Sequence, residues 1–327
     1  MQFAPLQWPV PGLLPEGLAL IGGKPKLGKS FMALDLALAV TGAKRAMGII
    51  ACQPGHALYC ALEDCERRLQ TRIAAMMPAG APFPERLDLV IEMKRLGEGG
   101  EEQLERWLDA HPDARLIIID TWRCIKPASD GRKTGYDEDA AGMQRLHAIA
   151  KHRPGLCILV VHHTRKQEAD DPMDMISGTT GLTGVPDTLL VLARHGEGAR
   201  LVAVSREMDG YDKALKRNPD TNGWTIIGDA KQLAATAERQ EILEALEGAP
   251  AEGLSSRDVA DTIGKSEPTV RRTLNRMAKA GEVQRLKRGR FACPNGPNVP
   301  KPKAAPNDDW DNGTDETGRF DHDEEDD

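Results

Sequence analysis

The sequence predicts an α/β protein with a mainly parallel sheet, followed by a small helical domain and an acidic tail. Three observations support this prediction. Short apolar runs alternate with helical patterns from Leu18 to about Gly228, the patterns are only helical after Ala230, and Pro, Asn, Gly and acidic residues dominate from Pro294 onward. We therefore expect one domain at residues 1–232, a second at 233–293, and a disordered tail at 294–327.

The composition favours a cytoplasmic protein. Of the 327 residues 40% are hydrophobic but only 4% are aromatic, so the core should be aliphatic. Six cysteines lie at irregular spacings without a C-x-x-C pair, which favours a reducing compartment and disfavours a zinc site. The first residues lack the basic start of a signal peptide, and no apolar run approaches the length of a membrane span, so no membrane partner is expected.

The elements of the α/β region can be assigned in chain order. Strands are expected at Leu18–Gly22, Ala57–Leu62, Leu87–Met93, Arg115–Asp120, Cys157–His162, Thr188–Leu192, Leu201–Ser205 and Trp224–Ile227. Helices are expected at Ser30–Val40, Cys65–Met76, Glu101–Ala110 and Asp137–His152. The last three strands follow one another through short turns, so the sheet should end antiparallel. Two polar, charged loops, Lys126–Gly135 and Arg165–Asp174, are expected to be poorly ordered.

A glycine-rich motif connects the first strand to the first helix. Residues 23–30 read G-K-P-K-L-G-K-S and satisfy the P-loop pattern G-x-x-x-x-G-K-[ST]. In a P-loop, backbone N–H groups surround the phosphates, the lysine (here Lys29) reaches the β- and γ-oxygens, and the hydroxyl (here Ser30) ligates Mg²⁺. The sequence therefore predicts ATP and Mg²⁺ as cofactors. The residues expected at the nucleotide are Gly23, Lys24, Pro25, Lys26, Leu27, Gly28, Lys29, Ser30 and Phe31.

Three further polar residues follow buried strands and are candidates for the chemistry. Asp120 ends the run Leu116–Ile119 and should act with Ser30 at the metal. Glu63 follows the strand Ala57–Leu62 and is the candidate that activates the attacking water, unless it only stabilises a helix N-terminus, a role that Asp64 can fill instead. His163 is the candidate that senses the γ-phosphate and signals to the following loop.

These motifs together resemble those of RecA-like ATPases, and most closely the RepA-type hexameric replicative helicases of plasmids and phages. The resemblance covers roughly Trp8 to Ile227 and rests on the P-loop, the Glu63-Asp64 pair, and the segments Ile117–Thr121, Val161–Lys166 and Ile176–Gly181. It implies a homo-oligomeric, hexameric ring that hydrolyses ATP between subunits and holds single-stranded DNA in its channel.

The resemblance has one departure that concerns catalysis. In the segment Ile176–Gly181, the RepA-type plasmid helicases have an arginine directly before the first glycine, whereas this chain has Ser177. Arg206 stands where related helicases carry a basic residue that reaches the neighbouring γ-phosphate, and is the candidate finger; a plain surface arginine is the alternative.

Two groups of cations are candidates for DNA contacts. The loops after Asp120 and His162 resemble the channel loops of RecA-like rings, and their cations suit single-stranded DNA unless they are only solvated. They are Lys126, Arg132, Lys133, Arg165 and Lys166. Helices at Ala237–Leu246, Ser256–Ile263 and Glu267–Ala280 and a hairpin at Glu282–Phe291 predict a winged helix-turn-helix for duplex DNA. Its candidate contacts are Arg271, Arg272, Arg276, Arg285, Lys287, Arg288 and Arg290.

The net charge of −7 combines two opposite regions. Asp308–Asp327 holds eight Asp and three Glu against one Arg, a net −10, whereas Lys265–Arg290 holds nine Lys or Arg against two Glu, a net +7. Two roles for the acidic tail stay open: it competes with DNA for the basic region, or it docks a basic replication protein.

Three functions fit these patterns. The first is an ATP-dependent DNA helicase or translocase of plasmid or phage replication. The second keeps the ATPase but makes it a recombination mediator or loader that does not unwind DNA. The third is a winged-helix DNA-binding regulator switched by ATP, which Glu63 argues against because a switch needs no activated water.

Overall fold

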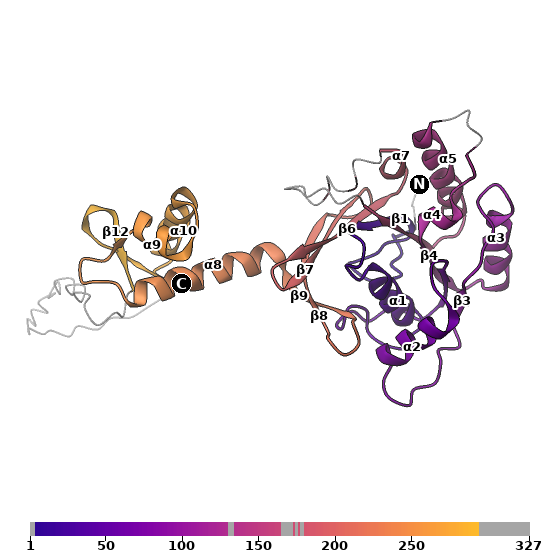
Figure 1. The fold of residues 1–327 in the computed structure, drawn as a ribbon, viewed down its shortest axis with the longest axis horizontal. Coiled ribbons are helices and arrows are strands. Elements are labelled where there is room, and N and C mark those ends of the chain that lie inside the picture. Colours follow the sequence, from indigo (N-terminus) through magenta and orange to yellow (C-terminus); the bar gives the residue numbers. More distant parts are fainter. Residues whose placement is uncertain (1–3, 130–133, 165–172, 174–175, 177–179, 294–327) are drawn as a thin grey trace, which may run out of the picture. The chain divides into compact units, whose positions relative to one another are not determined.

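The computed structural model describes residues 4–129, 134–164, 173, 176 and 180–293. The chain divides into two compact units, one that ends at Thr236 and one that begins at Ala237 (Figure 1). In the described part of the chain, no helix combines the length and the apolarity that a membrane span requires.

A nine-stranded sheet forms the first unit, with the strand order β3-β2-β4-β5-β1-β6-β7-β8-β9. The strands are β1 (Gly17–Gly23), β2 (His56–Ala61), β3 (Leu87–Val90), β4 (Ala114–Asp120), β5 (Cys157–His163), β6 (Thr188–His195), β7 (Gly198–Ser205), β8 (Tyr211–Arg217) and β9 (Trp224–Asp229). Strands β1 to β6 pair in parallel, whereas the pairs β6–β7, β7–β8 and β8–β9 are antiparallel. The predicted α/β class with antiparallel last strands is thereby confirmed.

Helices cover both faces of this sheet (Figure 1). They are α1 (Lys29–Val40), α2 (Glu66–Met76), α3 (Gly100–Ala110), α4 (Trp122–Ile125), α5 (Gly135–Lys151) and α7 (Thr180–Thr183). The aliphatic residues of α1 and α2 pack on one face and those of α3, α4 and α5 on the other. Because successive strand residues alternate between the faces, Ile118 and Asp120 of β4 lie on the side of α1, and Ile117 and Ile119 lie on the side of α5.

One strand of the sheet, β8, was not among the predicted strands. Its residues, Tyr211 to Arg217, include four charged side chains, and a bulge between Ala214 and Leu215 interrupts their alternation. Strand β7 pairs with β8, and β8 pairs with β9. The expected strand from Leu87 to Met93 is also wrong at its end, because β3 stops at Val90.

The second unit combines helices with a small antiparallel sheet. Helix α8 (Ala230–Glu247) begins seven residues before the expected Ala237 and runs across the expected boundary at residue 232. It is followed by β10 (Leu254–Ser255), α9 (Ser256–Ile263), α10 (Glu267–Lys279), β11 (Gln284–Arg285), η1 (Lys287–Gly289) and β12 (Arg290–Ala292), with the strand order β10-β12-β11. Apolar residues such as Ile242, Val270 and Leu274 form its core.

Helix α9 begins with a capping box at Ser255. The Ser255 hydroxyl accepts the Asp258 N–H at 3.2 Å, while the Asp258 carboxylate accepts the Ser255 N–H at 2.9 Å. The tail at 294–327 lies outside the described residues.

Candidate functional site

The P-loop forms a turn between β1 and α1 at the carboxyl edge of the parallel strands. Gly28, directly before α1, adopts a left-handed conformation with φ of 98°. Lys26, within the loop, is also left-handed, with φ of 63°. A Cβ atom on Gly23 would lie 2.6 Å from the Leu192 carbonyl oxygen, so only glycine fits there. The strand, the glycines and the helix thus produce the local geometry that phosphate binding by backbone N–H groups requires.

Lys29 lies beneath this turn. It is only 2% exposed, and its Nζ donates hydrogen bonds to the carbonyl oxygens of Gly23 at 2.6 Å and Lys24 at 2.9 Å. Burial lowers the pKa of Lys29 to about 8, although the charges of Asp120 and Glu63 oppose this shift. The ammonium group is therefore held at the loop by two neutral acceptors, which a phosphate can outcompete because it is charged.

Asp120 ends β4 beside the P-loop and is 5% exposed. Its Oδ2 accepts a hydrogen bond from the Tyr59 hydroxyl at 2.9 Å, and its carboxylate also accepts one from the Ser30 hydroxyl. Burial raises the pKa of Asp120, while the two hydrogen bonds and His163 lower it. The peptide bond from Asp120 to Thr121 is cis.

Ser30 and Asp120 together fit a magnesium ion. The carboxylate and the hydroxyl are hard oxygen donors, they are already in contact, and Mg²⁺ is bound in nucleotide sites by one or two carboxylates and the phosphates. A Mg²⁺ ion held there would supply the Lewis acid that neutralises charge on the phosphate oxygens.

Glu63 and Asp64 follow β2 but point to different partners. Glu63 accepts a hydrogen bond from the Thr121 hydroxyl at 2.9 Å and lies 3.6 Å from His163 Nε2. Asp64 accepts the Cys65 N–H at 2.9 Å and pairs with Arg68 and Arg72 of α2. Asp64 is thus the acid at the helix N-terminus, and Glu63, 46% exposed, is the carboxylate that faces the strand ends.

The two histidines that end β5 lie on opposite faces of the sheet. His163 is on the same face as Asp120, is 38% exposed and lies beside Glu63. His162 is partly buried on the other face, where burial lowers its pKa to about 4 even though the charge of Asp139 raises it. The Thr164 hydroxyl is buried without a partner among the described residues, and its N–H bonds to the Gly23 carbonyl at 3.2 Å.

Phe31 lies in a cluster of aromatic rings and guanidinium groups next to the P-loop. The guanidinium carbon of Arg72 lies 5.0 Å from the centre of its ring, and that of Arg217 lies 5.7 Å from it. Arg217 also lies 5.8 Å from the ring of Trp224, whose indole N–H donates to the Gly28 carbonyl at 3.2 Å. Strand β8 and the start of β9 therefore support the P-loop from the side.

Arg206 lies at the edge of the sheet opposite to the P-loop. Ser205 pairs with Thr188 at the start of β6, whereas Gly23 pairs with Leu192 farther along that strand. The exposed Arg206 guanidinium donates to the Gly184 carbonyl at 2.9 Å. The arginine is therefore far from the nucleotide site of its own chain.

Most of the cations predicted in the two loops lie outside the described residues, namely Arg132, Lys133, Arg165 and Lys166. Lys126 is described and pairs with Asp139 at 3.5 Å. An exposed aromatic residue not considered in the sequence analysis, Tyr136, lies nearby at the start of α5 and is 54% exposed. Its backbone packs against Gly181 of α7, so the start of α5 contacts α7.

The basic residues of the second unit have different surroundings. Arg271, Arg272 and Arg276 of α10 are exposed, with hydrogen bonds only to acceptors on their own helix among the described residues. Arg285 and Lys287 are exposed. Arg290 is instead half-buried and donates to the Gly253 carbonyl at 2.7 Å, a hydrogen bond that links β12 to the turn before β10. The side chain of Arg288 lies outside the described part.

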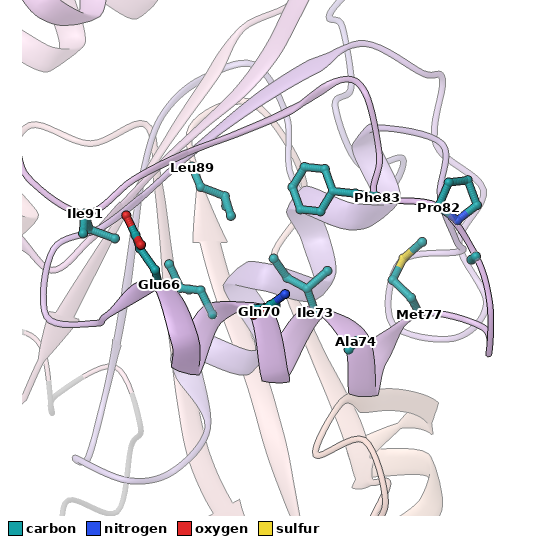
Figure 2. A pocket seen from close by; sticks show the side chains of 11 residues that line it. Glu66, Gln70, Ile73, Ala74, Met77, Pro82, Phe83, Leu89 and Ile91 are labelled. Atoms are coloured by element: carbon teal, nitrogen blue, oxygen red, sulfur yellow. The ribbon is translucent and has the colours of Figure 1, made fainter.

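An apolar pocket of about 400 Å³ lies away from the P-loop, between α2 and the segment around Phe83 (Figure 2). It is lined by Glu66, Leu69, Gln70, Ile73, Ala74, Met77, Ala81, Pro82, Phe83, Leu89 and Ile91. None of the nucleotide-site candidates lines it. The charged candidate residues converge instead at the strand ends.

The fold and the site define a RecA-like P-loop ATPase core. Residues 1–169, more than half of the chain, match the family model described as an AAA domain, and the chain belongs to this family. No curated protein sequence matches the chain significantly.

Two solved structures share the fold. One is described as an ATPase domain, and the match has a TM-score of 0.51 with 11% identity and covers 64% of this chain and 84% of that chain. The other is described as a DnaB-like replicative helicase and its interactions with primase, with a TM-score of 0.51, 11% identity, and coverage of 64% and 57% respectively. This chain thus spans little more than half of the second protein.

The predicted site residues did not include Tyr59, Thr121 and Arg217, which contact Asp120, Glu63 and Phe31 respectively. A signal for Tyr59 exists, because Tyr59 and Ala61 alternate along β2 and share the face on which Ile118 and Asp120 of the neighbouring strand lie. Thr121 follows a predicted site residue directly. Arg217 lay in the strand that we missed, so its position beside the P-loop could not be inferred.

Proposed function

We propose that the protein is an ATP-dependent DNA helicase or translocase of the RepA type that acts in plasmid or phage replication. The observation that carries the proposal is the convergence of Lys29, Asp120, Glu63 and His163 at the ends of β1, β4, β2 and β5. The likeness in fold to a DnaB-like replicative helicase supports the assignment to DNA unwinding.

In this proposal each group at the strand ends has one role. The P-loop N–H groups and Lys29 bind the phosphates of ATP, and Ser30 and Asp120 hold Mg²⁺. Glu63, oriented by the Thr121 hydroxyl, accepts a proton from the attacking water. His163 lies next to Glu63 and senses the γ-phosphate at the point where β5 gives way to the second loop.

Catalysis in this proposal needs a second subunit. A transition state of phosphoryl transfer gathers negative charge, which arginine fingers stabilise in many NTPases. Arg206 is exposed but lies at the opposite edge of the sheet, so it can act only on the nucleotide of a neighbouring subunit. We therefore propose a homo-oligomeric ring, hexameric by its resemblance to RepA-type helicases.

Single-stranded DNA would bind near the start of α5, where this helix contacts α7. Lys126 and Tyr136 are the described residues there, and the loops add Arg132, Lys133, Arg165 and Lys166. Cationic side chains bind the phosphate backbone of DNA irrespective of the DNA sequence, and an exposed tyrosine can stack on any base. These properties fit a translocase, which must move along every sequence.

The second unit would act as a winged-helix module for duplex DNA, with α10 as the recognition helix. Arg271, Arg272 and Arg276 are exposed on this helix, and Arg285 and Lys287 follow in the wing. Arg290 is the weakest of the predicted contacts because it already bonds to Gly253. Docking of a basic replication protein on the acidic tail stays an alternative to electrostatic competition with DNA.

One experiment separates the three functions that the sequence allows. Strand displacement on a forked duplex is measured together with ATP turnover, in the presence and absence of single-stranded DNA. DNA-stimulated turnover with displacement supports the helicase. Stimulated turnover without displacement would favour a mediator or loader, and ATP binding without turnover would favour a switched regulator.

A further inference from the structure

Tyr59 is a polar side chain within an otherwise aliphatic region of the core. It is 1% exposed and lies in the middle of β2, next to β4 in the sheet. Its hydroxyl lies 2.9 Å from Oδ2 of Asp120 and 3.4 Å from the carbonyl oxygen of Ser30. One phenol group thus connects the two elements that carry the predicted metal ligands.

When the Tyr59 phenol is protonated and the Asp120 carboxylate is ionised, the phenol can serve only as the hydrogen-bond donor. A phenol hydroxyl carries its proton at neutral pH and a carboxylate oxygen can only accept, so Tyr59 is the donor in this contact. A hydrogen bond from a buried neutral donor to a carboxylate is strong and directional. The hydrogen bond from Tyr59 is accepted by Oδ2 of Asp120 and so restrains the rotation of this carboxylate.

We infer that Tyr59 is a positioning residue for the divalent cation, because it holds the Asp120 carboxylate in the orientation in which it meets the Ser30 hydroxyl. The inference rests on the proposed ATPase function. Its ring is fixed by packing in the core, so the position of its hydroxyl is determined by the sheet itself. Groups that orient metal ligands commonly change metal affinity about 10- to 100-fold when removed.

The test compares Tyr59→Phe with the parent chain, since phenylalanine keeps the ring and removes only the hydroxyl. We expect the Mg²⁺ concentration that half-saturates binding of a fluorescent ATP analogue to rise about tenfold. Binding of the same analogue in EDTA should be unchanged, because Lys29 and the loop N–H groups do not contact Tyr59. Electron paramagnetic resonance of Mn²⁺ with ADP should show the same weakening without any catalysis.

Tyr211→Phe is the matched control. It also removes a hydroxyl that is hydrogen-bonded within the protein, one that donates to the Leu13 carbonyl at 3.0 Å, and it should leave the Mg²⁺ requirement at the parental value. An equal shift in both variants would mean that Tyr59 is only structural and would overturn the inference. So would a Tyr59→Phe protein with the parental Mg²⁺ requirement.

A double variant tests whether the effect passes through Asp120. In an Asp120→Asn background, Tyr59→Phe should cause no further change in Mg²⁺ requirement, and an undiminished tenfold change would contradict the inference. If the parent itself shows no Mg²⁺-dependent hydrolysis, the proposed function fails. If the parent is active and Tyr59→Phe matches it, only the role of Tyr59 fails.

A measurement on the unaltered sequence covers the case in which Tyr59→Phe does not fold. The chain has three tyrosines, so the fluorine spectrum of protein labelled with fluorotyrosine can be assigned with Tyr136→Phe and Tyr211→Phe. The Tyr59 resonance should move when Mg²⁺ is added to the ADP complex, and the Tyr211 resonance should not. A Tyr59 resonance that ignores Mg²⁺ would overturn the inference.

Discussion

His163 Nε2 lies 3.6 Å from a carboxylate oxygen of Glu63, across the end of the strand that carries Asp120. The two residues end β5 and follow β2, which flank β4 in the sheet. The proposed base and the proposed phosphate sensor are thus adjacent only because the crossover connections bring three strand ends together.

The roles of Lys29 and Glu63 predict two different defects. Lys29→Ala should weaken nucleotide binding, because it removes the cation that faces the phosphates. Glu63→Gln should leave binding intact and lower turnover by roughly two or more orders of magnitude, since it removes general-base assistance. Equilibrium binding of an ATP analogue and steady-state hydrolysis measure the two effects separately.

Asp64→Asn is the matched control for Glu63→Gln. It also neutralises an acid after β2, but Asp64 contacts Arg68 and Arg72 rather than the strand ends. It should lower the stability of α2 and leave hydrolysis within a few-fold of the parent. If Glu63→Gln hydrolyses ATP at the parental rate, the catalytic assignment is wrong and a switch becomes the better explanation.

The sequence was sufficient to predict the class of the fold and the nucleotide motif, because both depend on local patterns. Apolar runs ending in Asp120 and His163 and the glycines of the P-loop are visible without any tertiary information. Strand β8 was not, since its Lys213 and Lys216 suggest a loop and a bulge breaks its alternation. Contacts such as those of Tyr59 with Asp120 and of Trp224 with Gly28 depend on strand order, which one sequence does not specify.

The location of Arg206 predicts a defect that subunits can complement. Arg206→Ala should bind ATP and assemble normally yet hydrolyse slowly, because the guanidinium stabilises charge only in the transition state of a neighbouring site. Mixed with Glu63→Gln subunits, it should regain partial activity at interfaces that pair an intact Glu63 with an intact Arg206. Turnover measured across mixing ratios tests this, and a complete lack of recovery would argue against action in trans.

His162 predicts a loss of stability in acid. Its pKa in the folded chain is lowered to about 4 by burial, with Asp139 opposing and His163 and Lys29 reinforcing the shift. As the pH falls below about 6.5, His162 becomes protonated in the unfolded chain but stays neutral in the folded chain. The free energy of unfolding therefore falls until the pH reaches about 4, where His162 is protonated in the folded chain as well. The loss from this group should be on the order of 2 kcal/mol at pH 5.

Denaturant unfolding at pH 7 and pH 5 measures this loss. His162→Gln should reduce the difference between the two pH values, because glutamine does not titrate. His152→Gln serves as the control, since His152 is exposed and should make little difference. A parental chain that is equally stable at both pH values would contradict the prediction.

The acidic tail predicts an increase in duplex affinity when it is removed. Deletion of Asp308–Asp327 removes a net charge of −10 that lies close in sequence to the basic region Lys265–Arg290. If the tail shields these cations, fluorescence anisotropy on a labelled duplex should show tighter binding, and the gain should shrink with added salt.

The exposed arginines of α10 predict the opposite change in the same assay. Replacement of Arg271, Arg272 and Arg276 by Ala should lower duplex affinity and flatten its salt dependence by up to about three ion equivalents. Hydrolysis of ATP without DNA should stay at the parental rate, because these side chains lie in the second unit.

Arg290→Ala is a useful comparison. Its guanidinium bonds to the Gly253 carbonyl, so the substitution should mainly lower the melting temperature of this unit and have less effect on the salt dependence of duplex binding. Unchanged duplex affinity in both the tail deletion and the triple variant would mean that α10 contacts a protein, and that the tail belongs to that interaction instead.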